Sequence, residues 1–249
     1  LFRNLQMGLF IKMIKSMKYF KKNFLILSLS FIALEASNSN IYEYEIRFSN
    51  KIGPFSLDGL KTFTKTGKTF TVVFEGENKF LNAEINQLSE FSFTNSKVFP
   101  RQYNQKVKMP IKGQQNQLIN FDFKNMQIIS SGDINWVIDF SNNDWPLDPI
   151  SSGFQIRQNL KMGIEEFEMN LLKLDEGTFH KNSFKVVGKE ILKIKNTNYP
   201  CKILERSDEK GRKSFYYVAE TLDFILIKVK DDRKERKISI EAEKILSFG

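Results

Sequence analysis

Apolar residues in this 249-residue chain mostly alternate with polar ones, so the dominant hydrophobic period is two residues. The clearest example is the first such segment, in which Tyr42, Tyr44, Ile46 and Phe48 are separated by charged side chains. Successive side chains of a β-strand point to opposite faces of the sheet, and this pattern therefore predicts a half-buried strand. Similar segments follow on both sides of one interruption, at residues 144–163.

The interruption at residues 144–163 has the features of a short helix. Asp148 can cap a helix, and Pro149 suits the first helical position because the N–H that proline lacks would be unpaired there. Gly163 can adopt the left-handed conformation that ends many helices. Apolar or long side chains recur between these signals at near-helical spacing, at Ile150, Phe154, Arg157 and Leu160. We expect one helix at about residues 148–162, with this stripe packed against the β structure.

The alternating segments on either side of the helix are short and separated by turn residues, which is typical of an antiparallel meander. Pro100 predicts an edge strand or a bulge, Gly188 predicts a bulge or a bend, and the polar run at 112–117 predicts a loop. Neither a fixed-period repeat nor a linker is evident in the sequence. The predicted fold class is therefore mainly β, an antiparallel curved sheet or barrel-like meander with one packed helix, in a single domain at residues 41–249.

Residues 1–36 are predicted to be an upstream extension and a cleavable signal peptide. A start at Met17 would give a basic segment at 17–23 and then an apolar run at 24–34, with cleavage near Ala36. That run is too short to cross a bilayer, so no transmembrane segment is expected in the mature chain. Ser37 stands where a lipoprotein would need cysteine. The expected location is the periplasm.

The basic character of the chain comes mostly from this leader. Residues 1–40 carry six of the 38 Lys and Arg residues but only one of the 29 Asp and Glu residues, and they account for +5 of the net charge of +9. The mature chain is nearly balanced, which argues against a nucleic-acid partner.

Few residues in the sequence point to catalysis. His180 is the single histidine and Cys201 the single cysteine, so a metal or haem site has few ligands and an internal disulfide cannot form. We expect His180 to be a solvated loop residue and Cys201 to be buried. Glu166 and Glu168 alternate with apolar residues, and a solvated strand face explains them. The sequence predicts neither an enzyme nor a bound cofactor.

The chain contains 24 phenylalanines, against seven tyrosines and two tryptophans. Phenylalanine adds large apolar area without a polar group, so these residues either fill a core or line an apolar cavity. Core packing is the simpler interpretation, because a curved sheet around one helix needs such filling. The alternative is a cavity, whose candidate lining residues are Phe48, Phe74, Phe121, Trp136 and Phe154.

Several segments, taken in order, resemble bacterial domain-of-unknown-function family 3108. They are the leader, the Tyr42 and Tyr44 strand, the strand of Ser92 with Phe99-Pro100-Arg101-Gln102-Tyr103, Asn120-Phe121-Asp122-Phe123-Lys124, Leu147-Asp148-Pro149-Ile150-Ser151-Ser152, and Phe184-Lys185-Val186-Val187-Gly188-Lys189-Glu190. The resemblance implies a secreted or periplasmic, mostly antiparallel β protein wrapped around a short helix. It implies no catalytic residues.

Two function classes fit these observations. The first is a non-catalytic protein of the cell envelope with a structural or interaction role, whose partners would be other envelope proteins. The second is a periplasmic carrier that binds a lipid or another apolar ligand in a Phe-lined β cavity.

The leader interpretation predicts that the mature protein begins close to Ser37. N-terminal sequencing of the protein from the periplasmic fraction should show this new terminus. Uncut protein in the cytoplasmic fraction would contradict the prediction.

Overall fold

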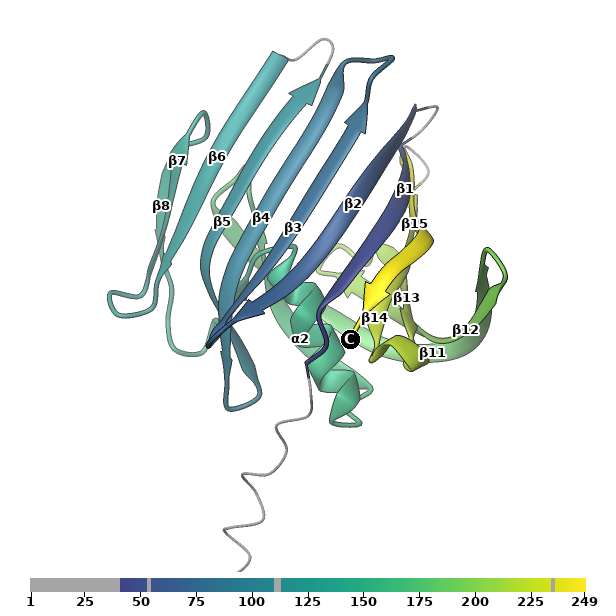
Figure 1. Ribbon diagram of the computed structural model, residues 1–249. Helices are drawn as coiled ribbons and strands as arrows, with labels where there is room; N and C mark the ends of the chain where they lie inside the picture. Colours follow the sequence, from purple (N-terminus) through teal and green to yellow (C-terminus); the bar gives the residue numbers. More distant parts are fainter. Residues whose placement is uncertain (1–40, 53–54, 110–112, 234–235) are drawn as a thin grey trace, which may run out of the picture. The chain divides into compact units, whose positions relative to one another are not determined.

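The computed structural model describes residues 41–249 except 53–54, 110–112 and 234–235, and the predicted leader at 1–36 lies outside the described residues. Residues Tyr42–Gly249 form one compact unit built from strands, one α-helix and a short 3-10 helix (Figure 1). The strands form a large curved antiparallel sheet, which confirms the predicted fold class.

The strands before the helix form the N-terminal arm of the sheet, and each pairs with the next through a hairpin connection. They are β1 (Tyr44–Ile52), β2 (Phe55–Thr66), β3 (Thr69–Asn78), β4 (Ala83–Thr94), β5 (Lys97–Met109), β6 (Gly113–Asp122), β7 (Gln127–Gly132) and β8 (Trp136–Asp139).

The chain then forms the short strand β9 (Pro146–Leu147) and the helix α2 (Ser151–Lys161), and continues into the C-terminal arm. The elements of this arm are β10 (Glu166–Lys173), β11 (Thr178–Ile194), β12 (Thr197–Asp208), β13 (Lys213–Ala219), the 3-10 helix η1 (Glu220–Leu222), β14 (Ile225–Arg233) and β15 (Arg236–Phe248).

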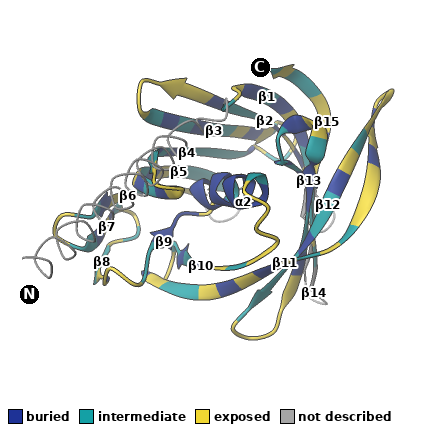
Figure 2. Ribbon diagram, turned by 90° about the horizontal axis from the view of Figure 1, so that it is seen from below, coloured by how far each residue is buried: buried dark blue, intermediate teal, exposed yellow. Residues whose placement is uncertain are grey.

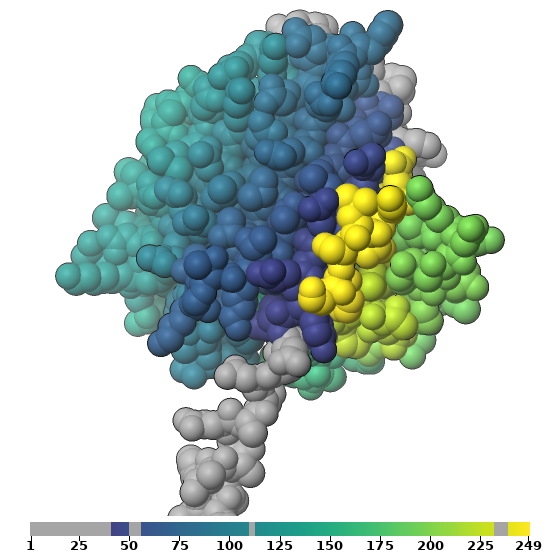
Figure 3. Space-filling view, in the orientation of Figure 1, coloured from purple at the N-terminus to yellow at the C-terminus, as the bar shows by residue number. Residues whose placement is uncertain are grey.

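The two arms join where the first strand pairs with the last. The strand order is β8-β7-β6-β5-β4-β3-β2-β1-β15-β14-β13-β12-β11-β10-β9, so β8 and β9 form the edges of the described sheet. The space-filling view shows the yellow β15 directly beside the purple β1 (Figure 3). All pairs are antiparallel except β9 with β10, which is parallel. The sheet is therefore open, and the first and last of its strands in chain order, β1 and β15, lie side by side in the middle of the strand order.

Two predicted irregularities lie where the sequence places them. The register between β4 and β5 shifts opposite Pro100 and leaves Arg101 without a partner in that ladder, and the register between β11 and β12 shifts at Gly188. The predicted polar loop was wrong, because its described part, 113–117, is the beginning of β6. This part of β6 pairs with β5 throughout. Gln117 is buried, and its side chain forms hydrogen bonds with residues of β5 and β7.

The helix α2 is three residues shorter at its start than predicted. Pro149 precedes the helix rather than occupying its first position. The carboxylate of Asp148 nevertheless holds this end, since its Oδ1 accepts hydrogen bonds from the backbone N–H of Ile150 (2.8 Å) and of Ser151 (2.9 Å). Gly163 has a φ of 76° and donates its N–H to Leu160, as expected of a left-handed residue after a helix.

The helix lies between the strands of the two arms, and nearly all of it is buried (Figure 2). Phe154 is the centre of an aromatic cluster on the inner face of the N-terminal arm. The ring centroids of its neighbours lie 5.1–5.5 Å from its own, and these neighbours are Phe63, Phe70, Phe91 and Phe93. This cluster is a filled core, which accounts for part of the phenylalanine content of the sequence.

Polar side chains of the helix attach it to both arms. Towards the N-terminal arm, Gln155 accepts a hydrogen bond from the N–H of Val98 (2.8 Å) and donates one to the carbonyl of Ser96 (3.0 Å). Towards the C-terminal arm, Arg157 Nη2 lies 2.5 Å from Asp223 Oδ2, and Lys161 Nζ lies 2.8 Å from the same oxygen. The helix therefore connects two parts of the sheet that do not pair with each other.

A third connection lies at the edge of the N-terminal arm. Trp136 Nε1 and Gln117 Nε2 both donate hydrogen bonds to the carbonyl of Leu174, at 2.9 and 2.6 Å, in the turn between β10 and β11. Side chains rather than a strand ladder thus link this edge to the other arm.

Replacing the carboxylate that the helix cations share should destabilise the fold. In D223N, the buried Arg157 and the half-buried Lys161 would lose this shared carboxylate, while asparagine tolerates the left-handed backbone of residue 223. We expect a loss of about 3 kcal/mol in the free energy of unfolding, measured by urea titration.

The matched control is E168Q, which removes one carboxylate from the exposed pair of Glu168 and Lys181. Exposed pairs contribute little, so this change should cost less than about 1 kcal/mol. Equal effects of the two substitutions would contradict the assigned role of Asp223.

Candidate ligand cavity

A cavity of about 340 Å³ lies between the concave face of the sheet and the N-terminal end of α2. Its apolar wall comes from both arms and from the start of the helix, and consists of Phe48, Leu57, Phe74, Ile85, Pro149, Ile150, Leu226, Val229 and Ile240. Lys61, Gln87, Tyr216 and Lys228 add polar atoms to this wall. A mostly apolar cavity of this size with a few polar groups is typical of a small-ligand site.

Two glycines shape one wall of the cavity. Gly59 on β2 and Gly76 on β3 are directly opposite each other in the ladder. A Cβ atom on Gly59 would overlap the ring of Phe74, and one on Gly76 would overlap Leu57. The missing side chains allow the Phe74 ring to lie close to the backbone of the sheet, and the space above it remains open.

A chain of hydrogen-bonded side chains crosses the inner face of the sheet from the cavity. Gln87, which lines the cavity, donates to the Tyr103 hydroxyl (2.9 Å), and Gln105 links that hydroxyl (3.3 Å) to Gln117 (2.8 Å). Gln117 then donates to Ser130 (2.8 Å). Burial raises the pKa of Tyr103, and the nearby Asp148 raises it further, so this phenol stays protonated.

Asp148, next to the lining residue Pro149, is a fully buried carboxylate. Its Oδ1 accepts the two backbone N–H groups at the start of α2, and its Oδ2 accepts a hydrogen bond from Ser89 Oγ at 2.9 Å. Burial raises the pKa of Asp148 above its ordinary value, and the hydrogen bonds only partly offset this effect. Asp148 therefore connects β4 to the helix end beside the cavity.

The charged side chains that line this cavity are cationic. A second, very small cavity of about 20 Å³ shares Lys61, Ile150 and Leu226 with it and is also lined by Arg157. Among the described residues, neither cavity has a lining aspartate or glutamate. The lining is therefore apolar with three cationic side chains, of which Lys228 and Arg157 are paired with carboxylates outside it.

The structure separates the five residues proposed as a cavity lining. Phe48 and Phe74 both line the 340 Å³ cavity. Phe154 lies in the aromatic core and lines the 20 Å³ cavity. Trp136 lies at the link to Leu174.

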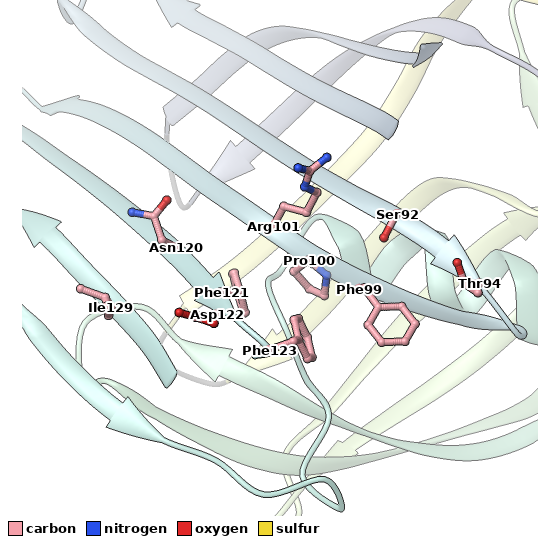
Figure 4. A pocket seen from close by; sticks show the side chains of 10 residues that line it. All are labelled: Ser92, Thr94, Phe99, Pro100, Arg101, Asn120, Phe121, Asp122, Phe123 and Ile129. Carbon is pink, nitrogen blue, oxygen red and sulfur yellow. The ribbon is translucent and has the colours of Figure 1, made fainter. Parts of the chain in front are cut away.

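Phe121 lies at a different hollow of about 720 Å³, built from β4, β5, β6 and β7. Figure 4 shows Phe99 and Phe123 close together beside Pro100, with Arg101 directed away from them. Ser92 also lines this hollow and follows the inward-facing Phe91, so it lies on the outer face of β4. The hollow is formed by neighbouring strands of one arm, whereas the concave cavity is lined by both arms and the helix.

Lys61, Lys228, Tyr216 and the glycine pair were not predicted from the sequence. The alternation of β2 could have indicated Lys61. This residue lies on the same face of the strand as Leu57 and Phe63, which are both buried. A lysine at an apolar position of an alternating strand is unusual enough to be noted.

The two candidate reactive residues lie outside this cavity. His180 is in β11 rather than in the predicted loop, and its Nδ1 lies 2.6 Å from Glu209 Oε2. Cys201 is buried, as predicted, and burial raises the pKa of its thiol to about 11.

Comparisons with known proteins support the fold. No protein-family model and no curated protein matches the sequence. A crystal structure of a beta-barrel-like protein of the domain of unknown function DUF1849 from Brucella abortus is similar, with a TM-score of 0.54 and 7% identity over 83% of this chain and 98% of that chain. A DUF1329 family protein from Desulfovibrio piger gives a TM-score of 0.29 and 12% identity over 86% of this chain and 88% of that chain. The chain thus shares its architecture with a beta-barrel-like protein of unknown function.

The described part of the chain also contains no helix long and apolar enough to cross a membrane.

The raised pKa of the buried Asp148 carboxylate predicts how the stability of the fold depends on pH. Because burial raises the pKa of folded Asp148 above 3.8, the unfolded chain loses this proton at lower pH than the folded chain does. Over that window the unfolded state binds fewer protons, and the contribution of Asp148 to stability falls as pH rises. In D148N this fall should disappear.

Urea unfolding of both proteins from acid to neutral pH measures the effect. Carboxylates with lowered pKa, such as Glu165 and Asp208, change stability in the opposite direction, but they are common to both proteins. The difference between the two curves therefore isolates Asp148. Parallel curves would show that Asp148 titrates normally.

Proposed function

We propose that this protein is a non-catalytic binding protein of the cell envelope that holds an apolar ligand in the cavity beside the start of α2. The main support is the cavity itself, whose apolar wall is drawn from both arms of the sheet and from the helix. Apolar surface in contact with water costs free energy, and a ligand that covers it recovers that cost.

The proposal also includes export of the protein to the periplasm. The basic and apolar segments at 17–34 are those of an export signal, and they support delivery of the protein to the periplasm. Membership of bacterial domain-of-unknown-function family 3108 is likewise proposed, from the order of the sequence segments described above.

A purely structural role is the alternative. Its support is the filled aromatic core around Phe154, because that part of the fold needs no ligand to exclude water. The two functions differ in whether the 340 Å³ cavity takes up an apolar molecule.

The substitution V229W tests the binding function, because Val229 lines the cavity and an indole at this position would occupy it. The wild-type protein should increase the fluorescence of the neutral dye N-phenylnaphthylamine in a saturable way. In V229W the dye affinity should fall at least about tenfold.

The control is V187W, the same substitution at a side chain on β11 that is 50% exposed. This variant should bind the dye like the wild type. Native mass spectrometry of the protein purified from its own envelope provides a second measurement, in which a bound ligand would add a mass that organic solvent removes. Absence of both dye uptake and added mass would favour the structural role.

A further inference from the structure

We propose, building on the proposed binding function, that the ligand is a single-chain amphiphile with an anionic headgroup and that Lys61 binds this headgroup. The apolar chain would occupy the 340 Å³ cavity. The position and surroundings of Lys61 carry this inference.

Lys61 faces the interior of the sheet rather than its outer surface. It is paired with Phe74 in the ladder between β2 and β3 and with Ile46 in the ladder between β1 and β2, and it lines both cavities. A lysine on an apolar inner face normally has a counter-charge, since an unpaired ammonium loses hydration there. Among the described residues, however, the Lys61 side chain has no ion pair and no hydrogen bond.

The other two cations at the cavities are already engaged. Lys228 Nζ lies 3.0 Å from Glu241 Oε1, and Arg157 is paired with Asp223. One nitrogen of Arg157, Nη1, is nevertheless buried and has no hydrogen-bond partner among the described residues. Lys61 and this nitrogen are therefore cationic donors to which the described residues supply no acceptor.

The charged side chains around this space determine the sign of the headgroup charge that fits there. The lining residues described for the two cavities include three cations and no carboxylate. Because Lys228 and Arg157 are paired with Glu241 and Asp223, the uncompensated charge is that of Lys61, and in a partly water-excluded site it attracts an anion more strongly than it would in water. A carboxylate or a phosphate satisfies this requirement, whereas a neutral or cationic headgroup does not.

The size of the cavity favours one short apolar chain. A volume of 340 Å³ corresponds to roughly eleven water-sized groups at the ~30 Å³ that one water occupies in the liquid. A chain of about ten carbons fills this space, and a two-chain lipid would not fit entirely within it.

The test compares ligands that share a chain and differ in headgroup. Decanoate, decyl phosphate and decanol are titrated at neutral pH against wild-type protein loaded with N-phenylnaphthylamine, and displacement gives their affinities. The same series is repeated with K61M, which keeps the length of the side chain and removes its charge, and with K61R, which retains the charge.

The control is K68M, because Lys68 is an exposed residue in the turn that joins β2 to β3. It makes the same change in net charge outside the cavity. The quantity compared is the ratio of anion affinity to decanol affinity in each protein, which removes the effect of chain burial.

We expect this ratio to fall about tenfold in K61M and to be unchanged in K68M, with K61R close to the wild type. A preference for decanoate over decyl phosphate, or the reverse, would identify the headgroup as a carboxylate or a phosphate.

Two negative results have different meanings. If all three ligands displace the dye with equal affinity, or if the ratio is the same in K61M, Lys61 is merely solvated and the headgroup proposal is wrong, while the binding function stands. If neither the dye nor any ligand binds, the proposed binding function itself fails.

Discussion

The buried polar side chains of α2 are the constraint on which the rest of the structure depends. An open sheet of fifteen strands has no ladder between its edges, so its curvature must be held by something on its concave face. Gln155 joins the helix to the turn between β4 and β5, and Arg157 joins it to Asp223 in the other arm. Both side chains are buried, and polar groups in that position are costly unless they are paired. The contacts therefore specify one position of the helix, and the aromatic cluster around Phe154 packs around it.

The sequence predicts the architecture well because strand alternation and helix signals are local. Tyr44, Ile46 and Phe48 are buried on one face as the period of two requires, and Gly163 ends the helix with a positive φ. The mistakes also have local causes. The glutamine and asparagine run that begins β6 reads as a loop, because its polarity conceals the fact that its backbone pairs with β5. The helix begins at Ser151, two residues after Pro149, although Asp148 accepts the N–H groups of Ile150 and Ser151 as an N-cap carboxylate does.

The cavity was harder to predict because its walls come from strands that are far apart in the sequence. Phe48 and Phe74 were candidates for an apolar lining, but nothing in their own segments distinguishes them from Phe154, whose ring is packed against four other rings. The distinction depends on Gly59 and Gly76, which become neighbours only when β2 and β3 pair. It also depends on the position of the helix end, which long-range contacts to Ser89 and Asp223 determine.

The same contacts explain why the cavity does not collapse. Apolar walls tend to close on empty space, and a side chain that can move will fill it. Here the two side chains best placed to do so are restrained. The Phe74 ring lies against the glycine pair, and the ammonium of Lys61 would lose hydration if the apolar wall closed around it without a partner. The helix end cannot move inward either, because Asp148 binds both its first N–H groups and Ser89 on β4. An open apolar space bounded by an unpaired cation is therefore maintained by the fold itself, and an anionic amphiphile is the kind of molecule that would satisfy both of its features at once.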